Sequence, residues 1–146
     1  MKWYFQVLRK YAVFRGRAGR KEWWMFGLIY LAVVFGLKGI DILLGTFDWD
    51  RRYDVLINVL SDFGTISGLY LIGTIIPVVA VTVRRLHDTN RSGWWYLIIF
   101  IPLFGGFQQL IWMAQRGQPD DNRYGPPPQD ATQNRPIVDT DLDTDL

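Results

Sequence analysis

Residues 84–93 have the sequence RRLHDTNRSG, and this short basic stretch separates two long apolar runs. The runs, residues 63–83 and 94–114, contain no Asp, Glu, Lys or Arg. Each is long enough to cross a bilayer, because the hydrocarbon core needs about 20 apolar residues in a helix. A connection this short between two spans has to turn back at the membrane surface. The pattern therefore predicts a membrane protein whose chain reverses direction at residues 84–93.

A further apolar run precedes this pair. We predict an all-α, polytopic integral membrane protein with three transmembrane helices at about residues 23–44, 63–83 and 94–114. Residues 1–128 form one membrane domain in this prediction. Residues 129–146 are rich in Asp and Thr and poor in apolar side chains, so we expect a disordered acidic tail. We expect the first span to be permanent, because it lacks the small-residue cleavage site of a signal peptide.

The segment before the first span has the pattern of an amphipathic helix over residues 3–14. Aromatic and aliphatic side chains recur at three- and four-residue spacing, and basic side chains take the other side. Such a helix lies at the headgroup boundary of anionic lipids, or it packs against the spans of its own protein. Both alternatives place it at the cytoplasmic interface.

Lys and Arg residues are distributed unevenly around the predicted spans. Seven occur in residues 1–22, two in residues 48–54 and three in residues 84–93. Because cytoplasmic flanks carry the excess of Lys and Arg, we place the N-terminus and residues 84–93 in the cytoplasm. Three spans then put the C-terminus outside. A re-entrant third segment, broken at Pro102 and Gly105-Gly106, would return the tail to the cytoplasm.

Composition excludes several classes of function. The chain has no cysteine and one histidine, His87, which excludes disulfides, thiolate catalysis and a multi-histidine metal site. His87 and Asp88 are neighbours that do not face each other on a helix, and no nucleophile, metal cluster or phosphate-binding glycine loop accompanies them. The formal net charge is +2, and membrane threading explains the N-terminal cations better than nucleic acid does. We predict no enzyme activity, no metal, no cofactor and no nucleic-acid partner.

Candidate binding residues are concentrated on the cytoplasmic side. We call these candidate residues the basic collar. Arginine presents a planar set of donors that suits phosphate, so the basic collar suits anionic lipid headgroups or an acidic segment of a partner. The alternative is a structural clamp, in which the arginines set topology and Asp88 and Asn90 cap or turn the backbone. Arg84 and Asp88, four residues apart, can pair if the helix continues to Asp88. The candidates are Arg84, Arg85, His87, Asp88, Arg91, Arg17, Arg20 and, if the tail returns to this side, Arg123.

Four residues with a charged or amide side chain lie within the predicted spans. Lys38 and Asp41 share one helical face, and ionisable groups inside a span are candidates for function. The alternative is that the Lys38 stem snorkels toward the outer surface. Gln108 and Gln109 need partners from other helices or from a wet crevice. These four residues would line the pathway of an oligomeric channel or transporter.

Three ordered motifs resemble a known family. They are FRGRAGRKEWW at residues 14–24, RRLHDTNRSGWW at 84–95 and GQPDDNRYGPPP at 117–128, separated by apolar runs. On these motifs the chain resembles the small bacterial inner-membrane proteins catalogued as domain of unknown function 805, over about residues 1–128. The resemblance implies a polytopic plasma-membrane protein of bacteria and implies no activity.

The predicted function is non-catalytic. We expect an inner-membrane protein whose basic collar binds anionic lipid headgroups or a membrane partner. That partner is another membrane protein or a second copy of this chain. The alternative is a subunit of an oligomeric small-solute or ion channel or transporter.

Overall fold

The computed structural model describes residues 2–45 and 64–128. The predicted acidic tail, 129–146, lies outside these residues. Within them the fold is all-α, and the one β contact is an isolated bridge between Asn122 and Gly125. The elements are α1 (Lys2–Arg9), α2 (Arg20–Leu43), α4 (Thr65–Asp88), the 3₁₀ helix η1 (Gly93–Phe100) and α5 (Phe104–Ala114).

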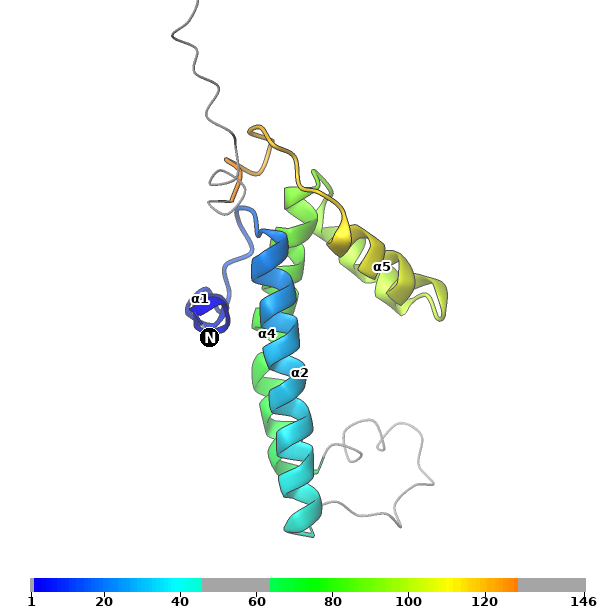
Figure 1. The fold of residues 1–146 in the computed structure, drawn as a ribbon. Coiled ribbons are helices and arrows are strands. Elements are labelled where there is room, and N and C mark those ends of the chain that lie inside the picture. The colour runs from blue at the N-terminus through cyan, green and yellow to red at the C-terminus, as the bar shows by residue number, and fades with distance from the viewer. Residues whose placement is uncertain (1, 46–63, 129–146) are drawn as a thin grey trace, which may run out of the picture.

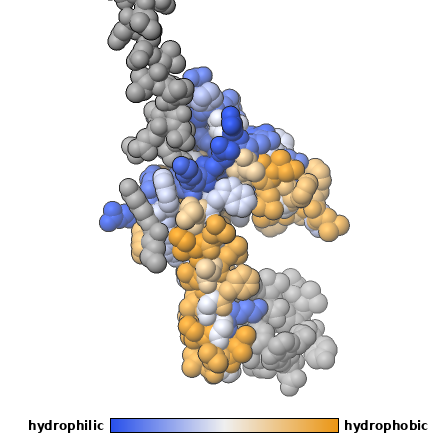
Figure 2. Space-filling view, in the orientation of Figure 1, coloured by the Kyte–Doolittle hydropathy of each residue, from blue (hydrophilic) through white to orange (hydrophobic). Residues whose placement is uncertain are grey.

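Helices α2 and α4 lie side by side and form the long axis of the molecule (Figure 1). Each has 24 residues, or about 36 Å at 1.5 Å per residue, which exceeds the roughly 30 Å hydrocarbon core. Both are long and apolar enough to cross a membrane, as predicted for the first two spans. Their outer faces are apolar, with Leu28, Phe35, Leu69 and Ile72 exposed, and Figure 2 shows this apolar surface.

One end of the α2–α4 pair is highly polar, and we call it the basic end. It contains the start of α2, the end of α4 and residues 15–19 and 115–125. Helix α4 continues through Asp88, so the first half of the predicted turn at 84–93 is helical. The chain reverses after Thr89, where Asn90 adopts a φ of 59°.

Helix α1 ends at Arg9, so the predicted helix over residues 3–14 is too long. The Lys10 N–H still donates to the Gln6 carbonyl at 3.2 Å, and just beyond it the Tyr11 hydroxyl donates to the Gly73 carbonyl of α4 at 2.6 Å. Val7 is buried in a core cluster that contains residues of α2 and α4. The aromatic ring of Tyr4 stacks on Phe26 with centroids 5.6 Å apart. The helix therefore packs its apolar side against the spans of its own chain, the second of the two alternatives.

The predicted third span over residues 94–114 is corrected by the structure. It forms two short helices, η1 and α5, that fold back on each other as a hairpin (Figure 1). Pro102 lacks an N–H for a continuous helix, and Leu103 adopts a φ of 64°. A Cβ on Gly105 would lie 1.8 Å from the Ile98 carbonyl oxygen, so glycine permits the close approach of the two arms. The hairpin starts and ends at the basic end and returns residues 115–128 there.

Candidate functional site

The basic end contains five buried charged side chains, which we call the polar clamp: Arg17, Glu22, Arg84, Arg85 and Asp88. Arg17 Nε donates to Asp88 Oδ1 at 2.9 Å. Arg85 Nη1 donates to the other carboxylate oxygen, Asp88 Oδ2. Arg84 Nη1 donates to Glu22 Oε1 at 2.9 Å. The clamp thus ties together α2, α4 and the segment before α2.

The predicted Arg84–Asp88 pair is replaced by these contacts. Arg84 faces α2 and forms an ion pair with Glu22 there. Asp88 forms an ion pair with Arg85, three residues earlier in α4. Sequence reasoning missed Glu22, although a signal was present, since it is the only acidic residue among the first 40. An acid within so basic a segment indicates a specific cation partner, because buried charges are paired.

The clamp arginines also hold the chain that follows α5. Arg17 donates to the main-chain carbonyls of Gln118, Asp120 and Gly125, the contact with Asp120 measuring 2.7 Å. Arg85 donates to the carbonyls of Met113 and Gln115. Two guanidinium groups therefore satisfy five carbonyl oxygens, one in the last turn of α5 and four in the irregular segment after it, which a guanidinium with five N–H donors can do.

Close packing and stacking complete the docking of residues 115–125. A Cβ on Gly117 would lie 2.0 Å from Asp88 Oδ2, so only glycine fits there. Asn122 Nδ2 donates to the His87 carbonyl at 2.9 Å. The Tyr124 ring stacks on the imidazole of His87, with centroids 3.8 Å apart. Arg123 Nη2 donates to the Asn90 carbonyl at 3.0 Å, so Arg123 does lie beside the other candidates.

The predicted collar residues divide into two groups by exposure. Arg17, Arg84, Arg85 and Asp88 are buried in the clamp, where they organise the fold. Arg20 and Arg123 are exposed. Arg91 is half-buried, and its guanidinium carbon lies 5.1 Å from the centre of the Trp112 ring. His87 is half-buried, with Nδ1 3.2 Å from the Gly16 carbonyl.

The polar residues predicted within the spans are not brought together as one cluster. Asp41, near the end of α2, accepts hydrogen bonds from the main-chain N–H groups of Ile66 and Ser67 at 3.0 and 2.8 Å. It therefore caps the start of α4, where the first N–H groups of a helix need acceptors. Lys38 is half-buried on α2. Gln108 and Gln109 lie on α5, Gln108 half-buried and Gln109 buried.

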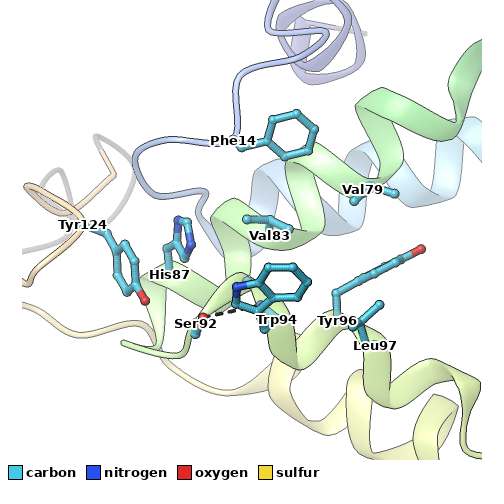
Figure 3. A pocket seen from close by; sticks show the side chains of 10 residues that line it. Phe14, Val79, Val83, His87, Ser92, Trp94, Tyr96, Leu97 and Tyr124 are labelled. Atoms are coloured by element: carbon cyan, nitrogen blue, oxygen red, sulfur yellow. Dashed lines mark hydrogen bonds between the residues drawn. The ribbon is translucent and has the colours of Figure 1, made fainter.

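A pocket lies beside the clamp, between α4 and η1 (Figure 3). Its volume is about 480 Å³, within the usual range of about 300–1,000 Å³ for ligand sites. Six of its ten lining residues lie within the three sequence motifs, but His87 was the only predicted site candidate among the lining residues. They are Phe14, Val79, Val83, His87, Ser92, Gly93, Trp94, Tyr96, Leu97 and Tyr124. Within the described residues, no group of three or more His, Asp or Glu side chains is placed to hold a metal ion.

Comparison with known proteins identifies the family. Residues 11–126 match the profile of the family described as protein of unknown function, DUF805. The chain belongs to the DUF805 family. The match includes every residue of the polar clamp and of the pocket, whereas α1 lies before it.

Two proteins of Escherichia coli strain K12 are similar to this chain. Inner membrane protein YhaH is 41% identical over 128 residues, which cover 88% of this chain and 97% of the relative. Inner membrane protein YhaI is 40% identical, with 88% of this chain and 96% of the relative covered. No solved structure matches the chain.

Proposed function

We propose that this DUF805 protein is a non-catalytic inner-membrane protein that gathers anionic phospholipid at the cytoplasmic surface. In this proposal α2 and α4 cross the membrane, and the basic end, with residues 2–19 and 115–128, faces the cytoplasm. The relatives YhaH and YhaI are named as inner membrane proteins, and α2 and α4 are of membrane-spanning length. The excess of Lys and Arg at the basic end supports the orientation.

The observation that carries the proposal is the apolar hairpin formed by η1 and α5. Its surface presents large apolar side chains to the outside, among them Trp94, Phe100, Leu103 and Phe107, which are 80%, 77%, 100% and 65% exposed. Figure 2 shows this hairpin as an apolar projection from the polar end. A projection of this composition is stable in hydrocarbon and unfavourable in water.

The length of the hairpin fits one leaflet of the bilayer. Eight residues of 3₁₀ helix and eleven residues of α-helix each extend about 16 Å, which is about half of the hydrocarbon core. The hairpin thus occupies the cytoplasmic leaflet. Backbone that reverses at this depth needs its polar groups satisfied within the protein. The N–H groups of Ile101, Phe104 and Gly105 donate to main-chain carbonyls of the same hairpin, at 2.8–2.9 Å.

Exposed charge at the same end supports a preference for anionic lipid. Among the described side chains of residues 2–19 and the basic end, six cations are exposed, compared with two exposed acids, Asp120 and Asp121. Each Lys or Arg near an anionic surface contributes about 1 kcal/mol of attraction. Lipids around the hairpin therefore lie beneath a positive surface. The six cations are Arg9, Arg15, Arg20, Lys21, Arg116 and Arg123.

Spin-labelled lipids test the proposal. The protein is reconstituted in phosphatidylcholine vesicles, and electron paramagnetic resonance measures the association of labelled phosphatidylglycerol relative to labelled phosphatidylcholine. We expect a preference for phosphatidylglycerol in the wild type that falls in the double variant Arg20→Ala with Arg123→Ala. The control is Arg20→Lys with Arg123→Lys, which keeps both charges and should keep the preference. Equal association of the two lipids with the wild type would refute the proposal.

A further inference from the structure

We propose that the pocket between α4 and η1 holds one anionic phospholipid, with an acyl chain along its apolar wall and the headgroup at its His87 end. This inference rests on the proposed function, because it needs the basic end to face the cytoplasmic leaflet. It goes further in assigning one lipid to one built site.

The pocket is graded along α4 from apolar to polar. Val79, Val83 and His87 follow at four-residue spacing and so lie above one another on one face of the helix. Eight residues of α-helix rise about 12 Å, so this wall is elongated. Figure 3 shows Val79 and Leu97 at one side of the pocket and His87 with Tyr124 at the other. An elongated site with one apolar end and one polar end suits an amphiphile.

Two exposed arginines that do not line the pocket lie next in the chain to residues that do. Arg123 is exposed, and its guanidinium carbon lies 4.8 Å from the centre of the Tyr124 ring, which itself stacks on His87. Arg15 is exposed between Phe14, which lines the pocket, and Gly16, whose carbonyl contacts His87. Arginine donors bind phosphate oxygens well, so this end of the pocket suits an anionic headgroup.

The occupant enters from the membrane because the pocket wall is continuous with the hairpin surface. Trp94 and Leu97 line the pocket and are also 80% and 49% exposed. In the proposed orientation this surface lies in hydrocarbon. An acyl chain therefore reaches the apolar wall without crossing water. A water-soluble ligand would have to leave the water and enter hydrocarbon to reach the same wall.

Native mass spectrometry can count the lipid. The protein is reconstituted in nanodiscs that contain equal mole fractions of phosphatidylglycerol and phosphatidylethanolamine. It is then transferred to detergent, washed, and analysed for the phospholipid that stays bound. We expect one retained phospholipid in the wild type and at least a fivefold lower retained fraction in Val79→Trp, which fills the pocket. The matched control is Ile72→Trp, an exposed position on the same helix outside the pocket, which should retain lipid as the wild type does.

A second pocket-filling variant and a headgroup variant complete the test. Leu97→Trp fills the pocket from η1 and should also lower retention, so that poor folding of one variant leaves the test intact. Arg123→Ala should lower the ratio of retained phosphatidylglycerol to phosphatidylethanolamine by about fivefold, given the attraction of one cation for an anionic surface. Undiminished retention in both folded tryptophan variants would overturn the pocket assignment, even with the spin-label preference intact. Equal association of the two spin-labelled lipids with the wild type would instead refute the proposed function, whatever the pocket variants retain.

Discussion

The docking of residues 115–125 depends on Arg17, and its replacement by glutamine gives a quantitative prediction. Arg17 forms a buried ion pair with Asp88 and bonds to three main-chain carbonyls of the docked segment. Glutamine is too short and too poor in donors to replace these contacts. We expect Arg17→Gln to leave α2 and α4 in place and to release the segment.

The magnitude follows from the contacts that remain. Removing one partner of a buried ion pair costs about 3–5 kcal/mol. Asp88 keeps its bond to Arg85, so the lower end applies, about 3 kcal/mol, which corresponds to about a 100-fold change in an opening equilibrium at 1.4 kcal/mol per factor of ten.

Amide hydrogen exchange in detergent micelles measures this opening directly. The main-chain N–H of Gln118 donates to the Asp88 carbonyl at 2.9 Å, so its protection reports docking. We expect its exchange to accelerate about 100-fold in Arg17→Gln. Arg20→Gln is the matched control, because Arg20 is exposed and outside the clamp. Acceleration of Gln118 by less than about threefold would refute the role assigned to Arg17, since the energetic argument requires far more.

Three other predictions test the fold. Asp41→Ala should lower the free energy of unfolding by about 2–3 kcal/mol, because it removes the cap of α4 and leaves the buried N–H of Ser67 without this acceptor. An unchanged thermal midpoint in detergent would contradict the capping role. Gly105→Ala should lower the thermal midpoint, since the added Cβ would lie 1.8 Å from a carbonyl oxygen of η1. Gly106→Ala is the control and should not, because a Cβ there meets no neighbouring atom within 4 Å. Equal midpoints for the two variants would argue against the hairpin. Single cysteines at Arg20 and Arg123 should both react with a membrane-impermeant thiol reagent from the cytoplasmic side, and labelling from opposite sides would require residues 94–114 to cross the membrane.

Hydropathy was sufficient to predict α2 and α4. Their apolar runs are long and uninterrupted, and the length requirement of a bilayer depends on the local sequence alone. The same criterion failed for residues 94–114, because hydropathy measures apolar length and not continuity of the helix. Pro102 and Gly105-Gly106 marked where a break could occur, but the reversal depends on the packing of Gly105 against the Ile98 carbonyl.

The candidate site was predicted in composition and not in arrangement. The sequence placed Arg17, Arg84, Arg85 and Asp88 on one side of the membrane, yet it did not show which of them are buried. The partners Arg17 and Asp88 are 71 positions apart, and Arg84 and Glu22 are 62 apart. Such pairs form only when the helices pack.

The sequence by itself determined the membrane class, the two long helices and the concentration of arginine at one end, because each follows from composition along a continuous stretch of chain. Tertiary structure alone decided three further features. It folded residues 94–114 into a hairpin, buried three arginines in a clamp that leaves Arg20 and Arg123 exposed, and formed a pocket between α4 and η1. The physical reason is that ion pairing, close packing and cavities depend on distances between atoms of segments far apart in the chain. Residues 84–93 illustrate this division, because the sequence alone shows their charge, whereas only the packed structure shows which residues they pair with.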